Sequence, residues 1–439
     1  MNDEKDTEIN GLILSSPGEI AVRSTSLVRR GLQLMNIQQP QEHDADFWHD
    51  MLRSTEADAL LGDADAQYCL GWHYHAGAGY PQDDTQAAFW YRKAAEQGQV
   101  EAQYYLSGMY VSGRGVQQDD SEAARWWRKA AEQGFTQLDH KGWLIVKAQF
   151  ELGCLYLEGR GVPQDDAEAA RWFRKAADQG HADAQHNLGF LYNHGRGVAQ
   201  DDTQAASWFR NAAERGLATA QYAIGNRYSI GMGVPQDDVE AVSWYQKAAD
   251  QGHARAQDRI GSAYWTGRGV TPDDEQAMVW FRKAAAQGFA DAQFSLAFGY
   301  ENGRGVPLDY AQAAYWYRMS ADQGDASARC FLAYMYANGL GVQKDVRQAA
   351  VLYHQAAEQG HDLAQYSLFH MYSQGQGVRQ DHVEAHKWCS LAASLASAQY
   401  EKEYSAARDA LAKEMTPQQL IEAAKRAREW MEAFERRRK

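Results

Sequence analysis

Apolar and polar positions recur along most of this chain with helical spacing, and each cycle contains two apolar stripes. In residues 100–134, the first stripe has the spacing of one helix face and consists of Ala102, Leu106, Met109 and Tyr110. Gly113 and Gly115 end this helix, and Asp120 is expected to cap a second one. The buried face of the second helix consists of Ala123, Ala124, Trp126, Trp127, Ala130 and Ala131. The pattern therefore predicts a helix–turn–helix unit that closes at Gly134.

The unit returns at a fixed interval along the chain. Variants of Ala-Ala-(Glu/Asp)-Gln-Gly close at Gly98, Gly134, Gly180, Gly216, Gly252, Gly288, Gly324 and Gly360. The interval is 36 residues throughout, except for 46 residues between Gly134 and Gly180. A period in this range indicates an array of stacked supersecondary units. Such arrays present extended binding surfaces, which favours an interaction protein over an enzyme.

A row of tryptophans and a row of tyrosines recur with the period of the repeat. A tryptophan of the second helix recurs at 90, 126, 172, 208, 244, 280, 316 and 388, with Leu352 as the exception, and a tyrosine closes each first helix. Residues this regular are interpreted as core. The consensus Ala-Gln-x-x-Leu-Gly-x-x-Tyr-x-x-Gly-x-Gly-Val, followed by Asp-x-x-x-Ala-x-x-Trp and a closing Gln-Gly, resembles the Sel-1-like repeat family. The resemblance implies an all-α, right-handed superhelical solenoid of about nine 36-residue repeats with helical caps, used as an adaptor or scaffold.

The periodicity also predicts the organisation of the chain. Residues 1–40 are expected to be loosely ordered, 41–62 to form an N-terminal capping helix, 63–394 to hold nine repeats, and 395–439 to form C-terminal capping helices with a basic tail. In the last segment, Met415-Thr416-Pro417 is typical of a helix start. The ten extra residues near 135–147 have two interpretations: a functional loop, or an extension of the following helix that packs on a neighbour.

Composition restricts the possible partners and the cellular location. Lys and Arg total 44 against 58 Asp and Glu, giving a net charge of −14, which argues against nucleic-acid binding and is compatible with a basic protein partner. No signal peptide or membrane span is apparent, and four scattered cysteines are typical of reduced thiols. We therefore expect a cytoplasmic protein, of bacterial type.

The motifs that could carry chemistry all have simpler explanations. The recurrent Gly-x-Gly follows a helix and lacks a third glycine, so a dinucleotide site is not expected. Paired aspartates such as Asp83-Asp84 are interpreted as helix caps that also complement the helix dipole. His382 and His386 lie one helical turn apart but have no evident third zinc ligand. We expect no catalytic residues, no metal site and no cofactor.

Comparing the repeats with one another separates constant from variable positions. The variable positions of the first helices fall on one face, and this first-helix stripe is the predicted partner-binding surface, with Trp72, Tyr105, Phe190, Asn226, Arg259, Phe298, Phe331, Tyr334 and His370 as its proposed contact residues. Aromatic side chains and arginine dominate binding hot spots. The alternative is that these aromatics bury against adjacent repeats. The outer face of the second helices is expected to be hydrophilic.

The sequence thus predicts a non-catalytic scaffold or adaptor that binds a protein or peptide, possibly basic, on a concave wall of first helices. The alternative is an immunity-type or inhibitory protein that neutralises a basic enzyme or toxin. A tight, salt-sensitive complex with one dedicated partner would favour that alternative.

Overall fold

The computed structural model describes residues 8–9, 12–13, 45–134 and 140–438, and these contain 21 helices. The first helices of the nine repeats are α4 (Ala64–Ala76), α6 (Val100–Ser112), α8 (His140–Glu158), α10 (Ala182–His194), α12 (Ala218–Ile230), α14 (Ala254–Thr266), α16 (Ala290–Asn302), α18 (Ala326–Asn338) and α20 (Asp362–Gln374). The second helices are α5 (Asp84–Glu96), α7 (Asp120–Ala131), α9 (Asp166–Asp178), α11 (Asp202–Glu214), α13 (Asp238–Asp250), α15 (Asp274–Ala286), α17 (Tyr310–Asp322), α19 (Val346–Ala357) and α21 (His382–Leu395). The predicted all-α repeat architecture is confirmed.

Local chemistry fixes both ends of each helix. Gly113 adopts the left-handed conformation (φ 68°) after α6, and its N–H donates to the Met109 carbonyl, as expected for a glycine C-cap. At the start of α7, the Asp119 carboxylate accepts from the N–H groups of Ser121 and Glu122. Asp119 is therefore the cap, and the expectation that Asp120 would fill this role is wrong by one residue.

The chain forms two compact units, 1–237 and 238–439, and each has a core between its helix layers. Small alanines such as Ala123 and Ala130 are fully buried and let the helices approach closely. Tryptophans fill the remaining space, and Trp126 and Trp388 are completely enclosed. The core interpretation of the tryptophan row is therefore confirmed for most members, whereas Trp90, Trp208 and Trp316 are half-buried.

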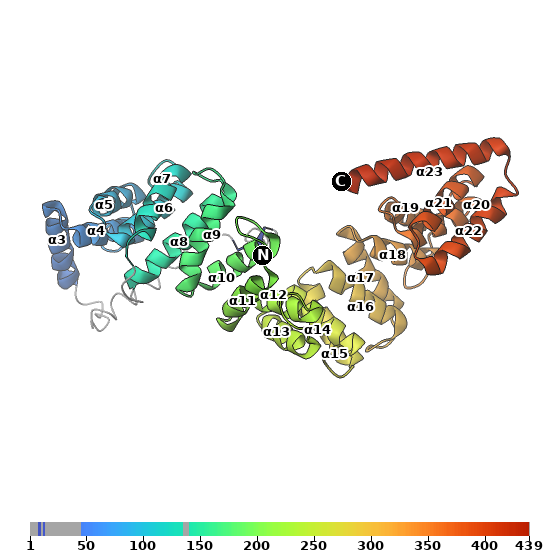
Figure 1. The fold of residues 1–439 in the computed structure, drawn as a ribbon, viewed down its shortest axis with the longest axis horizontal. Coiled ribbons are helices and arrows are strands. Elements are labelled where there is room, and N and C mark those ends of the chain that lie inside the picture. Colours follow the sequence, from blue (N-terminus) through green and yellow to red (C-terminus); the bar gives the residue numbers. More distant parts are fainter. Residues whose placement is uncertain (1–7, 10–11, 14–44, 135–139, 439) are drawn as a thin grey trace. The chain divides into compact units, whose positions relative to one another are not determined.

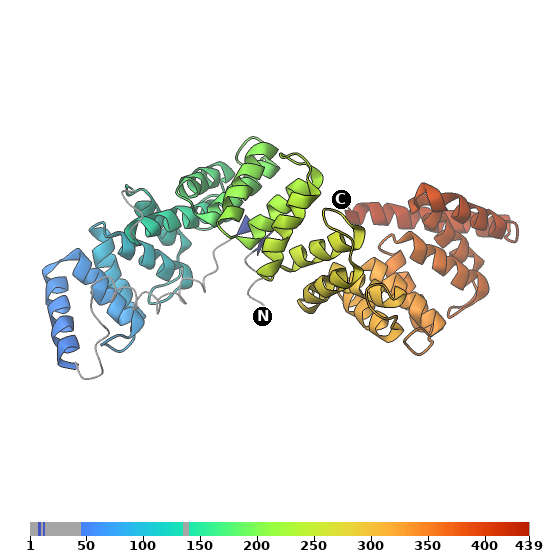
Figure 2. The same ribbon diagram turned by 90° about the horizontal axis from the view of Figure 1, so that it is seen from below.

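Helices outside the repeats flank the array at both ends. α3 (Ala45–Leu61) precedes α4, and α22 (Ala398–Ala412) and α23 (Pro417–Arg438) follow α21. Thr416 and Gln419 bond each other's backbone N–H groups, which forms a capping box at the start of α23. The Trp430 ring lies 6.1 Å from that of Trp388, so α23 packs along α21 (Figures 1 and 2).

Two short strands complete the described elements. β1 (Glu8–Ile9) pairs antiparallel with β2 (Leu12–Ile13), an arrangement that helical periodicity did not predict. The rest of the predicted loosely ordered segment 1–40 lies outside the described residues. The handedness of the superhelix stays a prediction.

The insertion lengthens a helix. α8 has 19 residues, whereas most first helices have 13, and the added part begins at His140. Leu144 and Ile145 are buried in the core cluster that contains α6 and α7. This agrees with the second interpretation of the insertion, an extension that packs on a neighbour, while residues 135–139 lie outside the described part of the chain.

Candidate functional site

Glutamines that recur at two positions of the repeat join consecutive repeats. The Gln103 side-chain amide donates to the Ala95 carbonyl (3.1 Å) at the end of the preceding second helix. Gln133, which precedes the closing glycine of the same repeat, donates in turn to Gln103 Oε1 (2.8 Å). The same glutamine pair recurs as Gln97–Gln67, Gln179–Gln149, Gln287–Gln257 and Gln323–Gln293. These amides satisfy helix-end carbonyls and each other, so they have a structural role.

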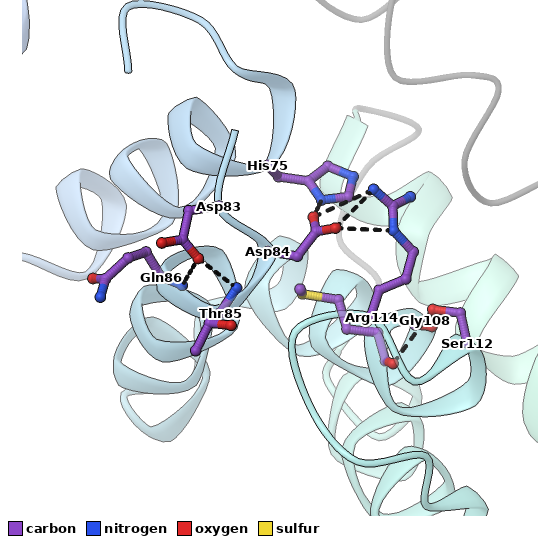
Figure 3. A network of polar contacts seen from close by, with 9 residues as sticks. His75, Asp83, Asp84, Thr85, Gln86, Gly108, Ser112 and Arg114 are labelled. Atoms are coloured by element: carbon purple, nitrogen blue, oxygen red, sulfur yellow. Dashed lines mark hydrogen bonds and ion pairs between the residues drawn. The ribbon is translucent and has the colours of Figure 1, made fainter. Parts of the chain in front are cut away.

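In most pairs of aspartates, the first caps a helix and the second forms an ion pair with the next repeat. Asp83 caps α5, whereas Asp84 accepts from Arg114 (3.1 Å) in the Gly-Arg-Gly turn of the next repeat (Figure 3). The equivalent ion pairs are Arg160–Asp120, Arg196–Asp166, Arg268–Asp238 and Arg304–Asp274. Capping by the first aspartate is confirmed, but the second one stabilises the junction between repeats, a role the sequence interpretation missed.

At three junctions between repeats the turn lacks this arginine, and the aspartate opposite it is replaced in two of them. Met232 replaces the arginine opposite Asp202, and Arg227 of α12 supplies the guanidinium instead, 3.3 Å from the carboxylate. Arg227 is only 5% exposed, and its burial lowers its pKa against the opposing effect of Asp202. In two later junctions, Leu340 faces a position held by Tyr310, and Gln376 one held by Val346. The helix-start aspartate is therefore absent at two of the three junctions that lack the turn arginine, whereas Asp202 is retained and pairs with Arg227.

From the second repeat onward, the second glycine of each Gly-x-Gly turn allows close contact between repeats. A Cβ at Gly115 would lie 1.9 Å from the Asp84 carbonyl oxygen, which no side chain could tolerate. The turn thus passes directly over the start of the preceding second helix. This contact explains the motif without any bound phosphate.

The regular tyrosines also link repeats. Arg282 of α15 donates to the Tyr300 hydroxyl (3.2 Å) at the end of the next first helix. Equivalent arginine–tyrosine hydrogen bonds join Arg92 to Tyr110, Arg128 to Tyr156, Arg174 to Tyr192, Arg210 to Tyr228 and Arg318 to Tyr336. The constant polar residues are therefore engaged in holding the array together, and the variable stripe is the remaining candidate for recognition.

In the first unit, the stripe residues lie at the surface to different extents. Trp72, Phe190 and Asn226 are half-buried on α4, α10 and α12. Tyr105 on α6 is held more firmly, because its ring stacks on those of Tyr68 (6.1 Å) and Tyr91 (6.0 Å). Burial raises the pKa of Tyr105 to about 12. Tyr105 therefore matches the packing alternative more closely than its neighbours on the stripe.

In the second unit, the stripe aromatics form a connected surface. The Phe298 ring lies 6.4 Å from Phe331, which itself stacks on Tyr317 of the second-helix layer at 5.4 Å. Tyr334 is 48% exposed. Arg259 and His370 are also exposed on α14 and α20. Contact of all nine residues with a partner stays a prediction.

The structure adds a residue to this surface that sequence comparison missed. Trp265 lies 6.0 Å from Phe298 and shares its face of the array. At the C-terminal cap, Tyr366 of α20 stacks at 4.1 Å on Tyr404 of α22, which is buried, so this contact belongs to the core. No other repeat has a tryptophan at the position of Trp265, and this difference between repeats is the sequence signal that could have identified Trp265.

The expectation that the second helices have a hydrophilic outer face is wrong in part. Within the described second helices, six residues are large, apolar and exposed: Phe89, Val239, Val279, Tyr315, Met319 and Val351. Four of them, Phe89, Val279, Tyr315 and Val351, occupy the equivalent position of their repeats. The second-helix layer therefore offers a competing surface that any test of the stripe must include.

Within the described residues, no cluster of three His, Cys, Asp or Glu side chains could hold a metal ion. None of the described helices is long and apolar enough to cross a membrane. None of the four cysteines takes part in a disulfide bond.

Comparison with known proteins agrees with the repeat geometry. The family model described as Sel1 repeat matches nine segments, at 64–99, 100–135, 146–181, 182–217, 218–253, 254–289, 290–325, 326–361 and 362–397. No curated protein matches the chain.

Several solved structures also resemble this chain. A protective antigen of uropathogenic Escherichia coli with an SLR fold is 32% identical, with 87% of this chain and 95% of that one covered and a TM-score of 0.52. A Sel1 repeat protein from Oxalobacter formigenes is 33% identical, with 74% and 90% covered and a TM-score of 0.58. An immunity protein from Pseudomonas aeruginosa is 22% identical, with 52% and 85% covered and a TM-score of 0.32. With nine matched repeats held together by the contacts described above, the chain belongs to the Sel1 repeat family.

Proposed function

We propose that this protein is a non-catalytic adaptor that binds a protein or peptide segment on its first-helix stripe. Extended helical arrays of this kind recognise partners along a surface rather than in an enclosed pocket. The partner lies across several consecutive first helices and inserts its own side chains between the stripe aromatics.

One contrast carries the proposal. The constant polar residues are engaged in caps, glutamine pairs, ion pairs and arginine–tyrosine bonds between repeats. The stripe varies from repeat to repeat and still carries large aromatic side chains at the surface, such as Tyr334 and Trp72. Exposed aromatics of this kind are costly in a merely solvated face but provide most of the binding energy in an interface.

The proposal also places the protein in the cytoplasm. None of the four cysteines, Cys69, Cys154, Cys330 and Cys389, forms a disulfide bond, as is typical of proteins in a reducing compartment. Cell fractionation with an antibody to the protein tests this location. Recovery in a secreted or periplasmic fraction would contradict it.

A triple variant tests the binding surface. Phe190→Ala, Phe298→Ala and Tyr334→Ala together should abolish capture of the partner from lysate, measured by quantitative mass spectrometry against the wild type. Each hot-spot truncation removes about 2 kcal/mol of binding free energy. Tyr315→Ala, on the second-helix face with 53% exposure, is the matched control and should leave capture unchanged.

The helical content and melting of the triple variant separate binding from folding. Unchanged circular dichroism with lost capture supports the proposal. Unchanged capture by a folded triple variant would overturn it, and loss of helicity would show that the aromatics are core residues.

A further inference from the structure

A buried carboxylate lies in the first-helix layer of the second unit. Asp258 of α14 is only 6% exposed, and its Oδ1 atom has no hydrogen-bond partner. Burial raises the pKa of Asp258 to about 6; the charge of Asp291 on α16 adds to this effect, and Arg259 opposes it. Its carboxylate is still largely ionised at pH 7, so a buried negative charge is left poorly satisfied.

Packing does not explain this aspartate. The equivalent position holds an aromatic ring in most other repeats: Tyr68, Tyr104, Phe150, Tyr222, Phe294 and Tyr366. In four of those repeats the ring contacts an aromatic ring of the second helix, as Phe294 does with Tyr317 at 5.5 Å. In this repeat Trp265 takes over the packing and lies 5.0 Å from Phe281. Asp258 thus replaces a stabilising ring with a charge that destabilises the free protein.

The position of Asp258 relates it to the stripe. It directly precedes the stripe residue Arg259 and lies two helical turns, about 10 Å, before Trp265 on the same face of α14. From Trp265, the aromatic surface continues to Phe298 and then to Phe331. An anionic group therefore adjoins one end of an aromatic surface, within a single compact unit.

We propose that Asp258 and Asp291 form the recognition site for a cationic side chain, arginine or lysine, of the bound polypeptide. Apolar residues next to that cation pack on Trp265 and Phe298. A guanidinium or ammonium group supplies the hydrogen bonds that Asp258 lacks, and it neutralises the repulsion between the two carboxylates. The inference rests on the proposed function and deepens it, because it specifies a basic segment with apolar neighbours as the ligand of the second unit.

Selection from a phage-displayed library of random 12-residue peptides tests the inference on the full-length protein at pH 7. Wild-type protein should enrich peptides that contain an arginine or lysine beside aromatic or aliphatic residues. Asp258→Asn should retain the apolar preference and lose the basic one. Asp322→Asn makes the same change in charge at an exposed site on α17 and should leave the selected sequences unchanged.

The affinity of one enriched peptide, measured by fluorescence anisotropy, makes the test quantitative. Asp258→Asn should weaken binding by at least about tenfold, because truncation of one partner in a desolvated charge pair is costly. Asp291→Asn should weaken it less, and Asp322→Asn by less than about twofold. Replacing the peptide's basic residue by glutamine should remove the difference between wild type and Asp258→Asn.

The outcomes distinguish the inference from the function on which it rests. If wild-type protein enriches peptides without a basic residue, or if Asp258→Asn binds them equally well, the cation site is wrong and the adaptor function stands. If the wild type enriches no peptide, or if Phe298→Ala enriches the same peptides, the proposed stripe itself is contradicted.

Discussion

Asp258 also allows a prediction about stability that needs no partner. The folded protein holds the Asp258 proton more tightly than the unfolded chain does, with a pKa of about 6 against 3.8. Stability should therefore fall as pH rises from about 4 to about 6 and remain constant above that range. The difference between these two pKa values corresponds to a loss of about 3 kcal/mol of stability at pH 8. Asp258→Asn removes the charge and should stabilise the second unit by up to that amount at pH 8, but by only about 0.5 kcal/mol at pH 4.

Hydrogen exchange measures this effect locally, which suits a repeat array whose unfolding is not two-state. Protection of amides in α14, α15 and α16 should increase in Asp258→Asn at pH 8, with little change at pH 4. Amides of α4 to α7 in the first unit serve as the internal control and should not respond. Equal or lower protection of the variant at pH 8 would show that the carboxylate is well satisfied in the free protein, and the reasoning would fail. A variant that is more stable but binds less well is the expected sign of a functional residue.

Two further predictions concern the junctions between repeats. Gly197→Ala should lower the free energy of unfolding by at least about 3 kcal/mol in thermal melts, because the new Cβ would lie 2.1 Å from the Asp166 carbonyl oxygen. Gly216→Ala, where φ is also positive but no atom lies within 4 Å, should cost only about 1 kcal/mol, and equal effects would contradict the close-contact argument. Arg227→Met should destabilise α11 and α12 by about 2 kcal/mol, since it leaves the Asp202 charge unpaired, and Met232→Arg should restore much of the loss. If the double variant has the same melting temperature as Arg227→Met alone, an arginine at position 232 cannot replace Arg227.

Helix–turn–helix units could be predicted from sequence because their signals are local. Alanine and tryptophan spacing, the glycine after each first helix and the aspartate before each second helix act within about 20 residues. Adjacent aspartates give the same capping signal, so the sequence does not distinguish Asp120 from the true cap, Asp119. The second aspartate's true role depends on an arginine 30 residues or more away, such as Arg160 for Asp120, which local patterns do not reveal.

The sequence predicted which face of the first helices holds the candidate site, but not which residues of that face are exposed. Repeat comparison located the stripe, since variable positions with helical spacing must share one side of a helix. It could not separate Tyr105, which stacks between two other tyrosines, from Tyr334, which is half exposed, because both are aromatic at variable positions. The roles of Asp258 and Trp265 could not be predicted from sequence. Trp265 makes the second-helix contact that a ring at the position of Asp258 makes in other repeats, and only the structure shows this exchange.

Site-specific photo-crosslinking tests the central claim most directly. The photoreactive residue p-benzoylphenylalanine is placed at Tyr334 on the first-helix stripe and, in a separate protein, at Tyr315 on the second-helix face. The two tyrosines are almost equally exposed, at 48% and 53%, so accessibility does not distinguish them. Irradiation in cells should give one discrete adduct from position 334 and none from position 315. An adduct from position 315 with none from position 334 would place the partner on the opposite layer and contradict the account.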